Sequence, residues 1–276
     1  MKKNNAFPVS LSMLLQDHSI EDGIRLAEQQ VRNNPAQAAY RHGLFQLLCI
    51  TGDWSRALQQ LQLCVRMDAN YTDEARLFRE LVRCEIFRHT VFQGEQQPGF
   101  ILPPPVWTES LLAALACEVN GETRKADEHR TTALEAIMEI SGQWNGSAFD
   151  WVSDSDSRIG PVLELVTGGV YIWLPFSQIR SLESPLPTRL TDLLWKPVNI
   201  TLVNGETHGA WLFTRYSGSD SACDALRLCR ETAWQDGPGE TAVRALGQKV
   251  WLSSHGDINL LDLTTCTFHE PEGCDV

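Results

Sequence analysis

Apolar residues in the first half of the chain recur with the three- and four-residue steps of an amphipathic α-helix. The pattern runs from Leu11 to Ser141, and Leu44, Leu47 and Leu48 illustrate one such face. A helix buries a stripe of this kind against a neighbouring element, so the pattern predicts a helical domain over residues 1–145.

The helical half also shows an internal repeat. Gly52 and Gly121 each follow an apolar helical segment, and an alanine, Ala57 or Ala126, stands five residues after each glycine. The glycines are separated by about two periods of the 34-residue tetratricopeptide repeat. We therefore expect a tetratricopeptide-like array with a degenerate repeat over residues 73–92, and an irregular helical bundle is the alternative. Stacked helix pairs form a concave groove that suits a peptide or an amphipathic helix.

The array contains an interruption at residues 93–105. Pro98, Gly99 and three consecutive prolines from Pro103 to Pro105 cannot continue a helix. The segment is either a spacer or an ordered loop over the groove.

From residue 146 onwards the pattern changes to short strands separated by turns. The expected strands are Pro161–Val166, Val170–Leu174, Ile179–Glu183, Val198–Val203, His208–Phe213, Lys249–Ser253 and Ile258–Leu263, with short helices over Leu190–Trp195 and Ala222–Arg230. Gly168-Gly169 and Asn204-Gly205 are typical two-residue hairpin turns. The sequence therefore predicts an α+β protein in which residues 146–276 form a small antiparallel sheet or partly open barrel.

Charge and hydropathy limit the classes of partner. The net charge is −12 and no basic patch is visible, so nucleic acid is not an expected ligand, and a basic protein segment is the better match. No apolar run approaches the roughly eighteen residues of a transmembrane helix. The N-terminus lacks the apolar run of a signal peptide, so the cytoplasm is the expected compartment.

The segment Asp154-Ser155-Asp156-Ser157-Arg158 contains the most suggestive chemistry. Two carboxylates at this spacing fit a divalent metal site, but such a site needs further oxygen ligands. The same residue types cap turns and form internal ion pairs, so we favour an internal network through Arg158, or one between Glu164 and Arg215. No nucleophile elbow or phosphate-binding loop is present, so we assign no catalytic residue, metal ligand or cofactor.

Four tracts, at residues 154–164, 171–176, 192–197 and 214–219, resemble the ImpE/SciE/TagJ family of type VI secretion accessory proteins. The residues that match are Asp154, Asp156, Arg158, Gly160, Pro161, Glu164, Tyr171, Trp173, Pro175, Asp192, Leu193, Trp195, Arg215 and Tyr216. The chain departs from the family pattern at Phe213 and Ser217, which replace prolines, and at Ala233, which replaces an aspartate.

The resemblance implies a non-enzymatic adaptor. Family members associate with the N-terminal helix of the small sheath subunit, and are thought to assist sheath assembly or turnover alongside an AAA+ unfoldase. If the helical array forms the groove, Tyr40, Arg41, Phe45 and Arg79 are the candidate contacts. The alternatives are a metal-dependent enzyme that uses Asp154 and Asp156, and a pure assembly scaffold.

Overall fold

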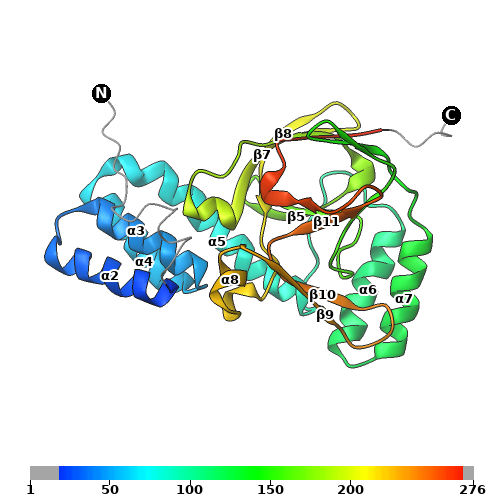
Figure 1. The fold of residues 1–276 in the computed structure, drawn as a ribbon, viewed down its shortest axis with the longest axis horizontal. Helices are drawn as coiled ribbons and strands as arrows, with labels where there is room; N and C mark the ends of the chain where they lie inside the picture. The colour runs from blue at the N-terminus through cyan, green and yellow to red at the C-terminus, as the bar shows by residue number, and fades with distance from the viewer. Residues whose placement is uncertain (1–18, 270–276) are drawn as a thin grey trace.

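The structure, a computed structural model, describes residues 19–269. A row of helices extends along one side of the molecule and packs against a strongly curved sheet (Figure 1). The helices are α2 (Ile20–Asn33), α3 (Ala38–Ile50), α4 (Trp54–Met67), α5 (Thr72–Phe92), α6 (Trp107–Val119), α7 (Thr123–Glu135) and α8 (Asp224–Arg227). The predicted α+β class is confirmed. Within the described residues, every helix is too short or too polar to cross a bilayer.

The helix pairs α3–α4 and α6–α7 meet at the predicted glycines. Gly52 and Gly121 have φ angles of 71° and 74°, the left-handed conformation that ends a helix. The Asp53 side chain then accepts a hydrogen bond from the Arg56 backbone N–H and caps α4. These two joints therefore follow from local sequence.

The prediction of a degenerate repeat over residues 73–92 is wrong. This stretch lies within one continuous helix, α5, because neither glycine nor proline interrupts it between Thr72 and Phe92. The following segment is ordered along the sheet: Gly99 donates to the Tyr171 carbonyl at 3.0 Å and accepts from the Trp173 N–H at 3.0 Å. Helix α5 is therefore followed by a stretch without helix, which runs to the start of α6 at Trp107.

Three sheets make up the rest of the fold. Their strands are β1 (Gly142–Trp144), β2 (Ser147–Phe149), β3 (Val152–Asp154), β4 (Val162–Thr167), β5 (Val170–Pro175), β6 (Ile179–Glu183), β7 (Trp195–Leu202), β8 (Thr207–Phe213), β9 (Thr232–Asp236), β10 (Val243–Gly247), β11 (Val250–Ser253), β12 (Ile258–Asn259) and β13 (Thr265–Phe268). The largest sheet has the order β2-β1-β13-β6-β7-β8-β4-β5, and all of its pairs are antiparallel. The smaller sheets are β12-β11-β3 and the hairpin β9–β10.

Several predicted boundaries need correction. Strand β7 begins at Trp195, three residues before the expected start, and the predicted helix is a 3₁₀ turn over Leu190–Leu193. Pro197 is tolerated in β7 because pairing with β6 reaches only to Asn199. Beyond Ile258–Asn259 the expected strand becomes a 3₁₀ turn, Leu260–Asp262, and the expected helix over 222–230 shortens to α8.

Both faces of the large sheet are buried. On the helical side Trp195 lies against Trp54 of α4 and Phe78 of α5, with ring centroids 5.8 and 5.9 Å apart. On the other side Phe176 packs against Trp251. The expected division between residues 145 and 146 falls in the turn between β1 and β2, and the helices share one core with the sheet.

Candidate functional site

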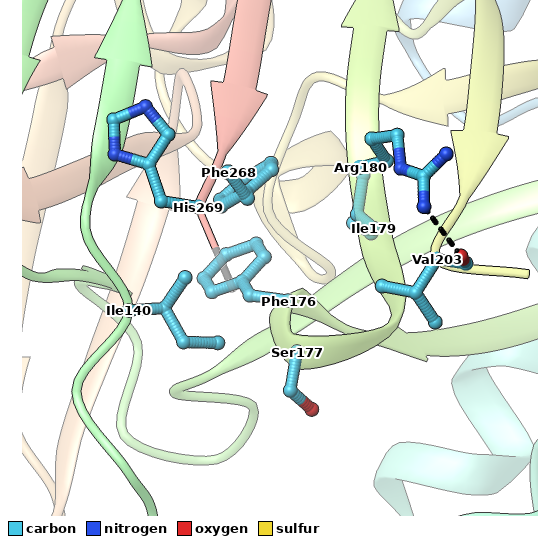
Figure 2. Close-up of a pocket in the computed structure, with 8 residues that line it drawn as sticks. All are labelled: Ile140, Phe176, Ser177, Ile179, Arg180, Val203, Phe268 and His269. Atoms are coloured by element: carbon cyan, nitrogen blue, oxygen red, sulfur yellow. Dashed lines mark hydrogen bonds between the residues drawn. The ribbon is translucent and has the colours of Figure 1, made fainter. Parts of the chain in front are cut away.

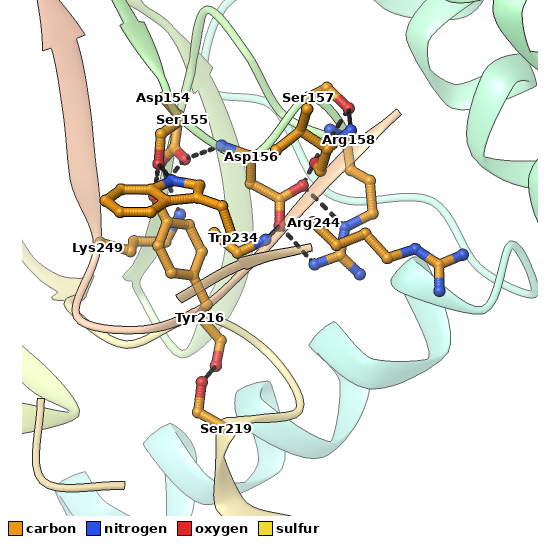
Figure 3. Close-up of polar contacts among 12 residues, drawn as sticks. Asp154, Ser155, Asp156, Ser157, Arg158, Tyr216, Ser219, Trp234, Arg244 and Lys249 are labelled. Atoms are coloured by element: carbon orange, nitrogen blue, oxygen red, sulfur yellow. Dashed lines mark hydrogen bonds and ion pairs between the residues drawn. The ribbon is translucent and has the colours of Figure 1, made fainter. Parts of the chain in front are cut away.

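The Asp154–Arg158 segment folds into a turn that is held by its own carboxylates. The Asp156 N–H donates to Asp154 Oδ1 at 2.9 Å, and the Arg158 N–H donates to Asp156 Oδ1 at 3.0 Å. Arg158 Nε also donates to Asp156 at 2.8 Å, and the Ala245 N–H reaches the second oxygen (Figure 3). The predicted internal pair with Arg158 is confirmed.

Asp154 continues the network into the core. Its two oxygens accept from the Tyr216 hydroxyl and from Lys249 Nζ, each at 2.8 Å. Lys249 Nζ lies 2.8 Å from Glu164 as well, so one ammonium group joins two buried carboxylates. The sequence alone indicated no role for Lys249.

Glu164 pairs with a residue that the sequence did not indicate. Arg88 of α5 donates to both of its oxygens, through Nε at 2.6 Å and Nη2 at 2.8 Å, and Tyr171 donates to it from β5. The expected Glu164–Arg215 pair is wrong: Arg215 Nη1 donates to the carbonyl of Ile50, at 2.7 Å. Both arginines therefore join the helical layer to the sheet.

The two carboxylates beside Lys249 differ in their pKa shifts. Burial alone raises the pKa of Glu164, but the charges of Arg88 and Lys249 outweigh burial and hold it far below its usual range. Burial raises the pKa of Asp154, and the single ammonium of Lys249 only partly opposes it. Glu164 is therefore a fixed anion that compensates the buried Arg88.

The arrangement is that of a structural network. The oxygens of Asp154, Asp156 and Glu164 already accept bonds from ammonium, guanidinium, phenol and backbone donors. Among residues 19–269, no group of three or more His, Cys, Asp or Glu side chains is placed to hold a metal ion. The turn is thus built to fix β3 against β10 and β11.

Other residues that match the family pattern also stabilise the fold through internal contacts. Asp192 accepts from the N–H groups of Thr188 and Arg189, each at 2.9 Å, and caps the turn before β7. The ring nitrogen of Trp173 donates to the Tyr171 hydroxyl at 2.7 Å. Gly160 has a φ of 46° and its carbonyl accepts from the Asp154 N–H.

Lys196 is fully buried at the start of β7. Its ammonium donates to the carbonyls of Leu260, Leu261 and Leu263, and burial lowers its pKa from 10.5 to about 8. Between pH 8 and pH 10.5 the Lys196 amine is more often protonated in the unfolded chain than in the folded protein. Its contribution to the free energy of unfolding therefore rises with pH.

We expect the free energy of unfolding of wild type, minus that of Lys196→Met, to increase from pH 7.5 to 10. Urea titrations across that range test this. The exposed Lys125→Met should not reproduce the rise, because pairing with Glu122 raises rather than lowers the pKa of Lys125.

The four candidate partner contacts lie on α3 and α5, but not together on the surface. Phe45 is fully buried against Phe78, with ring centroids 5.0 Å apart. Tyr40 and Arg41 are half-buried, and Arg41 donates to Gln60 at 3.2 Å. Arg79 is exposed and donates to the carbonyl of Ala75 in its own helix. Phe45 therefore belongs to the core rather than to a surface.

A hollow lies beside α6, bordered by the segment without helix that joins α5 to α6. This cleft has a volume of about 590 Å³, and is lined by Val91, Gly94, Gln96, Gln97, Phe100, Pro104, Thr108, Glu109, Leu112, Ala113, Leu115 and Ala116. A second hollow, between Ile140, Phe176 and Phe268, measures only about 40 Å³ (Figure 2). The α6 cleft alone of these two has room for the anchoring side chains of a peptide or helix.

Comparison with known proteins places the chain in a family. The sequence model of the ImpE protein matches residues 146–267. The type VI secretion system accessory component TagJ of Pseudomonas aeruginosa is 35% identical over 256 residues, which are 92% of this chain and 89% of that protein. The crystal structure of protein VPA1032 from Vibrio parahaemolyticus has a TM-score of 0.83 and 26% identity, over 91% of this chain and 94% of that one. Similarity of this extent means that the chain belongs to the ImpE family, which includes TagJ.

Proposed function

We propose that the protein is a non-enzymatic accessory component of type VI secretion that acts in the cytoplasm as an adaptor. The support is the relative from Pseudomonas aeruginosa, which is named as a type VI secretion system accessory component and is similar over nearly the whole chain. We further propose that the partner is the N-terminal helix of the small sheath subunit. Binding would assist sheath assembly or turnover, and the AAA+ unfoldase would be an indirect partner.

The observation that carries the adaptor proposal is the cleft beside α6. Leu112, Ala113 and Ala116 form a half-buried stripe along this helix, and Val91 and Phe100 also line the cleft. An amphipathic helix covers such a stripe with anchors at steps of three and four residues. The small alanine side chains allow the backbone of a partner helix to approach closely.

An acidic residue at the cleft favours a basic residue in the ligand. Glu109 is exposed at its rim, at the N-terminal end of α6, within a protein of net charge −12. A basic residue of the ligand beside Glu109 would be attracted, and the attraction would weaken as salt is added. The surface near Tyr40, Arg41 and Arg79 is the second possible location.

We expect Ala113→Arg to weaken binding of the sheath-helix peptide at least about tenfold, because the new side chain fills the cleft. The measurement is calorimetry with a synthetic peptide of the cognate small subunit's N-terminal helix, at two salt concentrations. Ala136→Arg is the matched control, because Ala136 is exposed at the end of α7 and outside the cleft. Glu109→Gln should reduce the salt dependence and leave the stoichiometry unchanged.

Two outcomes would count against these assignments. If a peptide that is shown to be helical fails to bind the wild-type protein, the adaptor proposal is wrong. If Ala113→Arg binds normally and Arg79→Ala does not, the groove lies on α3 and α5 instead. Circular dichroism must show that each variant keeps its helices before either conclusion is drawn.

A further inference from the structure

Strand β9 is the outer strand of the hairpin β9–β10, and it lies at the surface below the sheet (Figure 1). The Gln248 N–H donates to the Glu231 carbonyl at 3.1 Å, and the Gly237 N–H donates to the Ala242 carbonyl at 2.8 Å. These two bonds show which residues of β9 direct their backbone groups toward β10. Alternation then directs the N–H and C=O groups of Thr232, Trp234 and Asp236 away from β10. Among residues 19–269, none of these backbone groups has a hydrogen-bond partner.

The inner strand of the hairpin is fully occupied. The Val243 carbonyl accepts from the Ser157 N–H, and the Ala245 N–H donates to Asp156. The Gly247 carbonyl accepts from the Tyr216 N–H, and its own N–H donates to Ser219. Strand β10 is therefore bonded on both sides, whereas β9 is bonded on one.

The hairpin is also held at its tip. Asp127 of α7 accepts from the N–H groups of Glu240 and Thr241, at 3.0 and 3.1 Å, and from the Thr241 hydroxyl. An edge that is fixed in this way loses little conformational freedom when another strand pairs with it. The open edge is thus preorganised for strand addition.

Trp234 marks the middle of this edge. Its indole N–H donates to the Ser155 hydroxyl at 2.9 Å, and that hydroxyl lies 2.9 Å from the hydroxyl of Tyr216 in the buried network (Figure 3). The side chain is nevertheless 48% exposed. Proteins protect edge strands with charges, prolines or bulges, whereas β9 places a large aromatic ring at its centre and its charges at its ends.

The charges select the occupant. Glu231, Asp236 and Glu240 are exposed along the hairpin. Its basic residues are Arg230 and Arg244, and Arg244 is already paired with Glu118 of α6. Two copies of this edge would bring like charges together, which disfavours self-pairing. We propose that β9 binds an extended, lysine- or arginine-rich segment of a partner protein by strand addition, at a site separate from the α6 cleft.

The probe is a short peptide in which lysine and threonine alternate with valine, titrated while intrinsic tryptophan fluorescence is recorded. A Trp234→Phe variant identifies the part of the change that comes from Trp234 among the nine tryptophans. We expect saturable one-to-one binding that weakens with salt. Asp236→Pro should weaken binding about fivefold or more, because it removes one outward N–H and one charge. Asp236→Asn removes the charge alone, and should mainly reduce the salt dependence.

A second probe keeps the test decisive if Asp236→Pro does not fold. The same peptide, N-methylated at four consecutive residues, cannot pair through either edge, so it should not bind the wild-type protein. Equal binding of the methylated peptide, or of a glutamate-for-lysine version, would overturn the proposal. So would no saturation up to about 1 mM peptide, or dimerisation through β9 in sedimentation experiments. None of these readouts involves the sheath helix, so the two proposals can fail separately.

Discussion

Glu164→Ala is expected to lower the free energy of unfolding by about 3–5 kcal/mol, because it leaves a buried guanidinium without its counter-charge. Arg88 and Glu164 are each about 1% exposed, and Glu164 accepts from two nitrogens of Arg88. The same substitution removes one of the two carboxylates that compensate Lys249. Urea unfolding measures the loss.

Glu128→Ala is the matched control for this prediction. Glu128 also pairs with an arginine, Arg124, but its side chain is 65% exposed and the nitrogen–oxygen distance is 3.5 Å. An exposed helical pair contributes little, so the control should change stability by no more than about 0.5 kcal/mol. Similar losses in both variants would mean that the Arg88–Glu164 pair is not desolvated as the structure describes.

The same pair predicts an acid dependence. The pKa of Glu164 in the folded protein is held far below its ordinary value of 4.5. Ionised Glu164 therefore makes its full contribution to the free energy of unfolding above about pH 4.5, and this contribution is lost as the pH falls. Glu164→Gln should therefore show a flatter decline of stability below pH 4.5 than wild type. The pKa of Asp154 is raised, so ionisation of this residue lowers the free energy of unfolding. Asp154 is present in both proteins that are compared.

Local signals in the sequence predicted much of the fold. Gly52 and Gly121 lie at the joints of the helix pairs, and Asn204-Gly205 connects β7 to β8, because positive φ angles are a local requirement. The strand β13 was missed although Cys266 and Phe268 alternate with threonines and are buried, as the period-two rule requires. The hairpin β9–β10 was missed because its exposed outer strand lacks an apolar alternation.

The polar network was less predictable, for a physical reason. Arg88 and Glu164 are 76 residues apart, and Asp154 and Lys249 are 95 apart. The first pair forms when α5 packs on the sheet, and the second when β3 pairs with β11. No local pattern distinguishes a buried arginine from the exposed ones on the same helix. Asp156 and Arg158 are two residues apart within one turn, which is why that pair was predicted correctly.

Trp195→Ala is expected to lower the free energy of unfolding by about 3–5 kcal/mol through the cavity it leaves. Trp195 is fully buried, and Trp54 and Phe78 contact it from α4 and α5. Trp195→Phe should cost less, because it keeps most of the ring and removes an indole N–H that has no hydrogen-bond partner among the described residues. Trp151, which is 37% exposed, is the control, and its replacement by alanine should cost less than about 1 kcal/mol.

The Trp195 variants also test whether helices and sheet unfold together. Because Trp195 lies in the shared core and Arg88 and Arg215 cross the same interface, helix loss and tryptophan exposure should have one common midpoint. The midpoint should shift in Trp195→Ala, and the two signals should remain coincident. Helix loss at a lower urea concentration than tryptophan exposure would mean that residues 1–145 unfold as a separate unit, and that the shared core does not couple the two halves.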